Sequence, residues 1–287
     1  SNVINLRSLL FAPGNRADLI AKLPRSNPDA VAIDLEDAVP ANLKTEARAI
    51  TREAVSALLG SKPSCQIFIR VNPVSTPEFH DDIKGLSEKI DGIVLPKIEN
   101  SEHLKNVVEA LERHNLSHLN IVAGFETARG VENVSSILEQ HPKQLKAVYF
   151  GAEDFIADMG GERTQEGLEV LYARSKVVLA AKARRLLALD QVVTAFKDNE
   201  LFIADAKQAK NLGYTGKLCI HPSQVALAHE VFAPSEAEVE RAKRLLERYN
   251  QGVMQGKGVI DFEGQMVDEP ILIKARAVLK AAGIHYG

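Results

Sequence analysis

Short runs of apolar residues recur along the chain, separated by longer stretches in which apolar and polar residues alternate. Eight of these runs have the length of a strand, and several are rich in Val and Ile, which is typical of strands buried on both faces. The predicted strands are Ser8–Ala12, Ala30–Leu35, Gln66–Val71, Gly92–Leu95, Asn120–Phe125, Ala147–Phe150, Gln191–Thr194 and Gly216–Ile220.

The stretches between these runs carry helical patterns. Apolar residues that recur at i, i+3, i+4 and i+7 share one face of a helix. Such patterns cover residues 104–111, 168–182 and 204–212, and Gly213 is placed to end the last of them.

The alternation of strands and helices predicts a parallel sheet, and eight repeats predict an α/β fold, the (β/α)8 TIM barrel. An open, doubly wound sheet is the alternative. It is disfavoured because the turn at 11–16, after the first predicted strand, lacks the G-x-G-x-x-G spacing of a dinucleotide-binding loop.

A tail follows the eighth predicted strand. We expect residues 1–232 to form the barrel and residues 233–287 to form a C-terminal extension. The extension shows a helical pattern at 236–249, a glycine-rich stretch at 252–264 that includes a small hairpin, and a last helix at 270–282. A glycine-rich hinge before a helix suits a lid that moves over a site.

Composition narrows the function classes. The chain has 287 residues, of which 45% are hydrophobic and 25% charged, so it can bury a large core without disulfides. Its 35 basic and 38 acidic residues are interspersed, which disfavours a nucleic-acid partner. The two cysteines show no close spacing, which favours a reducing compartment, the cytoplasm. No apolar run reaches the ~20 residues that a membrane span needs, so we expect no membrane partner.

Polar and ionisable residues follow almost every predicted strand. In a TIM barrel the C-terminal ends of the strands meet at one rim, where the chemistry lies. The set as a whole is the main residue-based reason to predict an enzyme. It includes Arg16, Lys22, Glu36, Asp37, Arg70, Lys97, Glu126, Asp154 and His221, and the aromatic Phe11 lies with them after the first strand.

Glu126 and Asp154 follow consecutive predicted strands, and adjacent strands lie ~4.8 Å apart. Two carboxylates at that separation repel each other unless they share a proton or a cation. Mg²⁺ prefers oxygen ligands and often takes one or two carboxylates. The alternative is that one carboxylate pairs with Arg70 or Arg129. Zinc is disfavoured because the sequence has no His/Cys set with the spacing of ligands.

Three cationic or titratable residues at the predicted rim each allow two interpretations. Arg70 could grip a carboxylate or a developing enolate oxygen, or form a structural salt bridge with Glu36 or Asp37. Lys97 could form a Schiff base, but the surrounding acidic residues favour an ion pair. His221, which precedes a proline, is more often a structural cap than a base.

The strand-end motifs together resemble the HpcH/HpaI aldolase and citrate lyase β-subunit family. The matching segments occur in family order and span nearly the whole chain. They are LFAPGNR at 10–16, DLEDAV at 34–39, IRVN at 69–72, LPK at 95–97, FETARG at 125–130, GAED at 151–154, GKLCIHP at 216–222 and GQMVD at 264–268.

The resemblance implies a barrel that binds Mg²⁺ and makes or breaks C–C bonds in acyl thioesters. It places Glu126 and Asp154 on the metal ligands, and Arg70 and Asp268 on catalytic residues. Asp268 matches a lid aspartate that reaches a neighbouring subunit's site, which implies a homotrimer with shared active sites. Local sequence alone instead favours a cap of the last helix for Asp268. The substrate and coenzyme A would be held by Phe11, Arg16, Lys22, Arg70, Glu126, Ile220, His221 and Pro222, with Glu36 and Asp37 in support.

Two segments resemble the stand-alone members that act on free CoA thioesters: GAED at 151–154 and IHP at 220–222. The resemblance therefore favours cleavage of citramalyl-CoA or malyl-CoA to acetyl-CoA and a 2-ketoacid, with citramalyl-CoA preferred. A citrate lyase β subunit acting on a carrier-protein thioester and a malyl-CoA thioesterase stay open. So do a metal-free Schiff-base aldolase using Lys97 and a non-catalytic assembly subunit.

Overall fold

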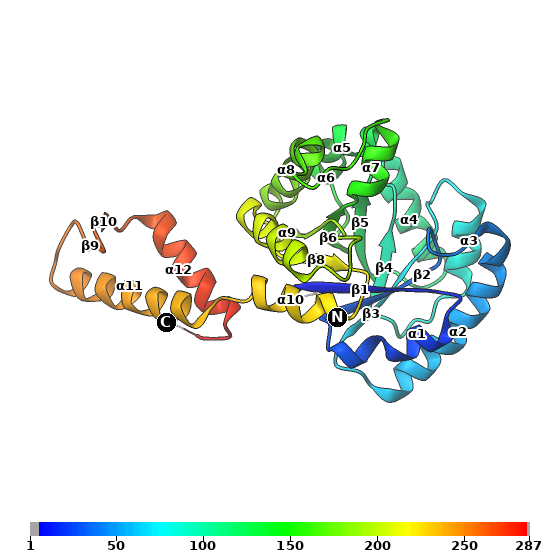
Figure 1. Cartoon of the computed structure of the whole chain (residues 1–287), viewed down its shortest axis with the longest axis horizontal. Coiled ribbons are helices and arrows are strands. Elements are labelled where there is room, and N and C mark those ends of the chain that lie inside the picture. Colours follow the sequence, from blue (N-terminus) through cyan, green and yellow to red (C-terminus); the bar gives the residue numbers. More distant parts are fainter. Residues whose placement is uncertain (1–5, 286–287) are drawn as a thin grey trace. The chain divides into compact units, whose positions relative to one another are not determined.

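The computed structural model describes residues 6–285. Eight parallel strands pair in sequence order, and β1 also pairs with β8, so the sheet closes into a barrel (Figure 1). This confirms the predicted (β/α)8 fold. The strands are β1 (Ser8–Pro13), β2 (Ala30–Asp34), β3 (Gln66–Arg70), β4 (Gly92–Leu95), β5 (Asn120–Phe125), β6 (Leu145–Phe150), β7 (Leu187–Asp190) and β8 (Gly216–Cys219).

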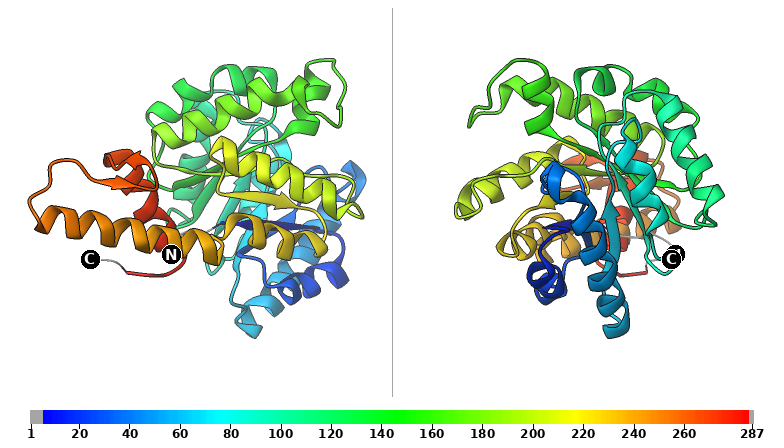
Figure 2. Two further views of the ribbon diagram at one scale, coloured as in Figure 1. Left: turned by 60° about the vertical axis from the view of Figure 1, so that its left-hand side comes forward. Right: turned by 90° about the vertical axis from the view of Figure 1, so that its right-hand side faces the viewer.

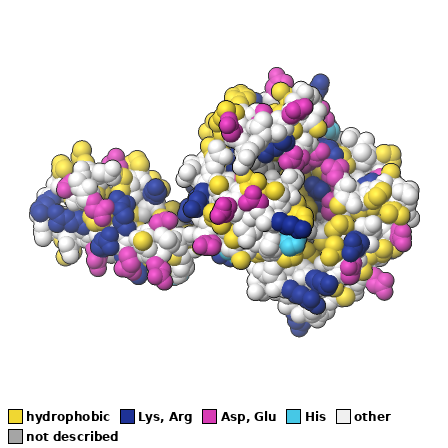
Figure 3. Space-filling view, in the orientation of Figure 1, with side chains coloured by type: hydrophobic (Ala, Val, Ile, Leu, Met, Phe, Trp, Pro, Cys, Tyr) yellow, Lys and Arg dark blue, Asp and Glu magenta, His cyan; other side chains and the backbone are white. Residues whose placement is uncertain are grey.

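Helices surround the strands and form the outer layer of the barrel (Figure 2). The predicted helical patterns lie in α4, α8 and α9, and Gly213 ends α9 with a φ of 109°, as expected. The helices are α1 (Ala17–Lys22), α2 (Lys44–Ser61), α3 (Pro77–Lys84), α4 (Ser101–Arg113), α5 (Ala128–Glu132), α6 (Val134–Glu139), α7 (Ala152–Asp158), α8 (Leu168–Ala183), α9 (Asn199–Leu212) and α10 (Ser223–Phe232), with short 3₁₀ turns at Leu23–Ser26 and Ala41–Leu43. On the face shown in Figure 3, acidic and basic side chains are interspersed over the barrel.

The seventh strand lies elsewhere than predicted. The sequence pattern favoured Gln191–Thr194, but the structure forms β7 from Leu187–Asp190. In this register Asp190 faces the outer helices, where it accepts hydrogen bonds from Arg174 Nε and Nη2 on α8 at 2.8 and 2.6 Å and from Lys217 Nζ on β8 at 2.9 Å. All three side chains are buried. A buried charge must be paired, and this requirement outweighs the β-propensity of the two valines that follow.

The barrel interior is filled by alternate residues of the strands. One cluster contains buried side chains from all around the barrel, and Phe11 packs against it. Successive residues of a strand point to opposite faces, so residues two positions later also face inward. Several of these later positions, at the carboxyl ends of the strands, are polar. They include Asp34 above Ala32, Arg70 above Phe68, and Glu126 above Gly124.

Residues 230–287 form a second compact unit, with the division three residues before the predicted one. It contains α11 (Glu236–Met254), a two-stranded hairpin of β9 (Asp261–Phe262) and β10 (Gln265–Met266), and α12 (Glu269–Ala281). Apolar side chains of α11 and α12, such as Leu246 and Leu272, pack together in one cluster. In the part of the chain that the structure describes, no helix is long and apolar enough to cross a membrane.

A candidate active site at the carboxyl ends of the strands

A cavity of about 400 Å³ opens at the carboxyl ends of the barrel strands. This volume suits a small-molecule site, for which 300–1,000 Å³ is usual. Predicted site residues from several strands share its lining. They are Phe11, Asp37, Arg70, Glu126, Asp154 and Ile220, which lie beside Pro13, Asp34, Gly151, Val192 and Leu218 among others.

Arg70, the last residue of β3, is held from two sides. Its Nε and Nη2 donate to the two carboxylate oxygens of Asp34 at 2.8 and 2.5 Å, and its guanidinium carbon lies 5.0 Å from the centre of the Phe11 ring. Asp34 is therefore the main partner of Arg70. Glu36, one of the two salt-bridge partners that the sequence predicted, is more distant, with Oε1 3.6 Å from Nε. The bidentate pair and the aromatic ring fix the plane of the guanidinium. Because Asp34 accepts from Nε and Nη2, the remaining nitrogen, Nη1, can donate to another acceptor.

Lys97 follows β4 and forms the ion pair that the sequence favoured. Its Nζ lies 2.6 Å from Glu36 Oε2 and 3.1 Å from Asp37 Oδ1. Burial would lower the pKa of Lys97, but the hydrogen bond and charge of Glu36 raise it above the usual value. A Schiff-base lysine needs a lowered pKa, so this geometry argues against the aldolase that uses Lys97.

The backbone of Lys97 serves the site as well. Its φ is 56°, a left-handed conformation that costs free energy in a residue other than glycine. In this conformation its N–H donates to Glu126 Oε2 at 2.9 Å. The turn after β4 therefore holds the carboxylate that follows β5.

The acidic side chains at this rim outnumber the cations. Burial raises the pKa of Glu126 to about 7, and that of Glu36 to about 8. Burial also raises the pKa of Asp154, and the charge of Asp37 adds to the effect. Among residues 6–285, no ion pair joins Glu126 or Asp154 to an arginine. Neither carboxylate therefore forms a direct ion pair with Arg70 or Arg129 among these residues, although the charge of Arg70 acts to lower the pKa of both.

This donor set fits a hard divalent cation. Two carboxylates that face one cavity and carry raised pKa values would be stabilised in their charged form by a bound cation. No group of three or more His, Cys, Asp or Glu side chains in the described chain is arranged to hold a metal by itself. Mg²⁺ commonly takes one or two protein carboxylates and completes its shell with water and substrate oxygens, so the residues present fit Mg²⁺.

Gly151, which follows β6, leaves room for Glu126. A Cβ added at residue 151 would lie 2.5 Å from both Cγ and Oε1 of Glu126. Gly151 belongs to the GAED motif, and the sequence alone indicates no role for it. The Glu126 carboxylate can thus occupy its position only because residue 151, at the end of the neighbouring strand, has no side chain.

Glu36 and Asp268 lie outside the cavity lining, and so do four residues that were assigned to the substrate and coenzyme. Arg16 pairs with Asp18 at the exposed start of α1, and Lys22 is exposed at the end of that helix. The His221 ring stacks on Phe196 at 4.9 Å, and its Nδ1 accepts from the Ser223 N–H at 3.1 Å. This is the capping arrangement that the sequence favoured for His221. Its neighbour Pro222 is exposed.

Asp268 belongs to the second unit, where it precedes α12. Its Oδ1 accepts from the Ile271 N–H at 3.3 Å, so it caps that helix, and its side chain is exposed. The capping role that local sequence suggested is therefore present. A role in chemistry stays a prediction.

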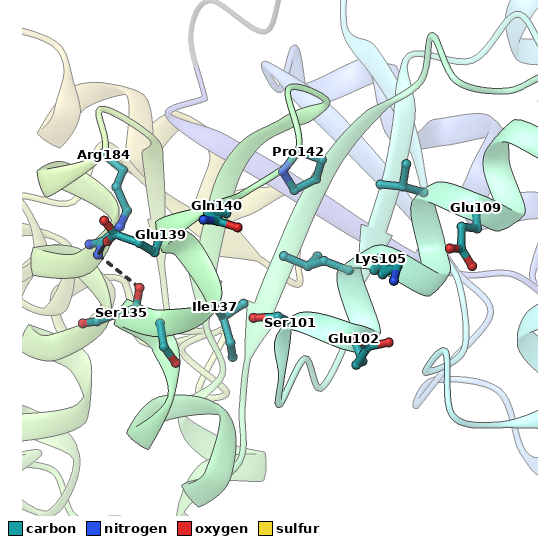
Figure 4. A pocket seen from close by; sticks show the side chains of 13 residues that line it. Ser101, Glu102, Lys105, Glu109, Ser135, Ile137, Glu139, Gln140, Pro142 and Arg184 are labelled. Carbon is teal, nitrogen blue, oxygen red and sulfur yellow. Dashed lines mark hydrogen bonds and ion pairs between the residues drawn. The ribbon is translucent and has the colours of Figure 1, made fainter.

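A larger hollow, of about 740 Å³, lies on the outside of the barrel between α4 and α6 (Figure 4). Ser101, Lys105 and Gln140 are among its lining residues, and Arg184 at its edge lies 2.5 Å from Glu139. None of the buried carboxylates lies there. We therefore place the candidate active site in the smaller cavity at the strand ends.

Known proteins of one family resemble nearly the whole chain. The model of the HpcH/HpaI aldolase/citrate lyase family matches residues 7–222. A citrate lyase subunit beta-like protein of Deinococcus radiodurans is 53% identical over 276 residues, which cover 96% of each chain. The mitochondrial citramalyl-CoA lyase of Homo sapiens is 34% identical over 292 residues, covering 96% of this chain and 85% of that protein. The crystal structure of the protein CitE from Mycobacterium tuberculosis, in complex with magnesium, acetoacetate and coenzyme A, has a TM-score of 0.81 and 30% identity, and the match covers 97% of this chain and 98% of that chain.

Proposed function

The chain belongs to the HpcH/HpaI aldolase/citrate lyase family and is an enzyme of the lyase class, and we propose that it is a Mg²⁺-dependent carbon–carbon lyase of the citramalyl-CoA or malyl-CoA type. Its substrate would be a 3-hydroxyacyl-CoA thioester with a carboxylate on the carbinol carbon, and its products acetyl-CoA and a 2-ketoacid. The observation that carries the proposal is the placement of Glu126 and Asp154, without an arginine partner in the described chain, in the same cavity as Arg70.

The reaction breaks the bond between the carbinol carbon and the carbon beside the thioester. The carbinol hydroxyl gives up its proton to a base, and its oxygen becomes the new carbonyl oxygen of the 2-ketoacid. The electron pair of the broken bond passes to the thioester fragment, which becomes an enolate and is then protonated to the acetyl group. The free energy barrier therefore depends on charge that develops on two oxygens, the carbinol oxygen and the thioester oxygen.

Glu126 and Asp154 would hold Mg²⁺, which supplies Lewis-acid polarisation of the hydroxyl and carboxylate oxygens of the substrate. Arg70 is placed for the other oxygen. Its guanidinium is fixed by Asp34 and Phe11, and Nη1 is left to donate to the thioester oxygen as the enolate forms. A donor that needs no rearrangement when charge develops is the most effective kind. Glu36 and Asp37 support the site by holding Lys97.

The cavity is large enough for the acyl part of the substrate, with Phe11 and Ile220 in its walls. The coenzyme would leave the cavity at this rim. We assign the exposed cations Arg16 and Lys22, which follow β1, to its phosphates, and His221 and Pro222 to the opposite side of its path after β8. The likeness to a CitE structure with bound coenzyme A supports this assignment.

We further propose that the enzyme is a homotrimer in which Asp268 completes the site of a neighbouring subunit. An exposed apolar stripe on α8 is the physical feature that favours association. Leu168, Tyr172 and Leu179 are 69%, 77% and 70% exposed and lie on one side of the helix. Exposed apolar surface of this kind commonly marks a contact with another chain.

The test is a cleavage assay over citramalyl-CoA, malyl-CoA and citryl-CoA, with and without a chelator. We expect release of CoA product and ketoacid from one of the first two, lost on chelation and restored by Mg²⁺. Cleavage only of a carrier-protein thioester would favour a citrate lyase β subunit, and thioester hydrolysis without C–C cleavage would favour a thioesterase. Activity that survives exhaustive chelation, with borohydride trapping at Lys97, would contradict the proposal.

A further inference from the structure

Tyr149 on β6 is buried in the barrel interior and packs with the central apolar cluster. Its hydroxyl has no hydrogen-bond partner of normal geometry among the described residues. Buried polar atoms in folded proteins are rarely left without a hydrogen bond, so an unpaired one needs an explanation. A phenylalanine would fill the same space without that unpaired atom.

The backbone of β5 explains where this hydroxyl lies. Gly124 is paired with Tyr149 in the register of β5 and β6. A Cβ at residue 124 would clash with Cζ and Oη of Tyr149, closer than real Cβ contacts come. The phenol end of the ring therefore lies directly over Gly124. Glu126 is two residues further along the chain and points to the same face.

The charges around the hydroxyl belong to the candidate site. Burial raises the pKa of Tyr149 well above its usual value, the charge of Glu126 raises it further, and the charge of Arg70 acts in the opposite direction. Arg70 and Glu126 line the same cavity, and the charges of both act on the phenol. A phenol oxygen can accept one hydrogen bond and donate another, and an ionised carboxylate has about four acceptor positions. The Lys97 N–H occupies one position on Glu126 Oε2.

We propose that Tyr149 is a positioning residue whose hydroxyl accepts a hydrogen bond from Arg70 and donates one to Glu126 when that carboxylate holds a cation. The phenol would then link the group that stabilises the enolate to the group that binds Mg²⁺. This inference rests on the proposed function, because it assumes a metal at Glu126. Partners behind a metal ligand fix its orientation, and their loss typically weakens metal affinity by about 10- to 100-fold.

The test compares Tyr149→Phe with a matched control, Tyr214→Phe. Tyr214 is equally buried, but its hydroxyl donates to the Arg174 carbonyl at 2.6 Å, away from the cavity. For Tyr149→Phe we expect Mg²⁺ affinity, measured by calorimetry, to fall by about tenfold or more, with the melting temperature unchanged or raised. For Tyr214→Phe we expect a lowered melting temperature and unchanged Mg²⁺ affinity.

Steady-state kinetics add a second measurement. If the hydroxyl also orients Arg70, Tyr149→Phe should lower kcat at saturating Mg²⁺ and leave the KM for the thioester nearly unchanged. Mg²⁺ affinity within twofold of wild type would overturn the inference while leaving the proposed function intact. Failure of Tyr149→Phe to fold would also overturn it, since the hydroxyl would then be structural. A wild-type chain that binds no Mg²⁺ would overturn both.

Discussion

Replacing Gly151 with Ala should change the stability of the fold only slightly, but should displace a side chain of the candidate active site and lower activity. The backbone at Gly151 has a φ of −102°, which alanine adopts readily. Its Cβ, however, would lie 2.5 Å from Cγ and Oε1 of Glu126. Non-bonded heavy atoms prefer about 3.5 Å, so the Glu126 side chain must move by about 1 Å.

The magnitudes follow from that displacement. The clashing atoms belong to a side chain that can rotate, at a cost of about 0.5–1.5 kcal/mol for an off-rotamer torsion. The change from glycine also reduces the entropy of the unfolded chain and stabilises the fold by about 0.4–1 kcal/mol. The free energy of unfolding should therefore change by less than about 1 kcal/mol. A misplacement of about 1 Å at a reacting centre can lower activity by about 100-fold, and we expect a loss of that size in kcat/KM.

The assay is Mg²⁺-dependent cleavage of the CoA thioester, combined with calorimetric Mg²⁺ binding and urea unfolding. Gly60→Ala is the matched control, because a Cβ at residue 60, near the end of α2, meets no atom within 4 Å. That variant should keep full activity and gain about 0.5–1 kcal/mol of stability. If Gly151→Ala keeps kcat/KM and Mg²⁺ affinity within threefold of wild type, Glu126 is not a metal ligand in the position described.

Three further predictions test other parts of the molecule. Arg70→Lys keeps the charge but loses the planar fork, and should raise the activation free energy by about 2–4 kcal/mol; a rate within twofold of wild type would leave Arg70 a structural role only. Asp190→Asn breaks a buried charge network and should lower the free energy of unfolding at pH 7 by about 3–5 kcal/mol. Burial alone would raise the pKa of Asp190, but the charges of Lys217 and a neighbouring arginine lower it. The Asp190 carboxylate therefore stabilises the fold above pH ~4, and this stabilisation is lost as the pH falls further. Equal acid sensitivity of variant and wild type in urea titrations would contradict this. Mixing Asp268→Asn with Glu126→Ala subunits, each inactive by itself, should restore activity in hybrid sites, and no recovery despite proven subunit exchange would confine Asp268 to its own chain.

Much of the barrel follows from hydrophobic periodicity. Seven of the eight strands lie where apolar runs predict them, within one or two residues at each end. The exception, β7, shows where local pattern is insufficient. Leu187–Asp190 and the following Gln191–Thr194 are both acceptable as strands, and the two valines favour the second. Only the distant partners of Asp190, Arg174 on α8 and Lys217 on β8, select the first.

The residues of the candidate site, at the carboxyl ends of the strands, could also be predicted in large part. Residues that follow strands were identified because the fold brings all strand ends together, and this rule placed Glu126, Asp154 and Arg70 in one cavity. Sequence could not choose between partners at that rim. The expected partner of Arg70 was Glu36 or Asp37, but the main partner is Asp34. The pleat turns residues 34 and 70 toward the interior at the same level of paired strands.

The residues that the sequence did not reveal as part of the site contribute by their side-chain volume rather than by charge. Along β5 and just past its end, the inward residues are Gly124 and then Glu126. Along β6 and just past its end, they are Tyr149 and then Gly151. A small residue on one strand thus faces a large one on the other, in opposite order. Each glycine accommodates the long side chain of the neighbouring strand, so a substitution at either one is felt by its partner across the sheet. Because this exchange of volume fixes both the Glu126 carboxylate and the Tyr149 hydroxyl, the position of the metal site is set by packing in the barrel as much as by the ligands themselves.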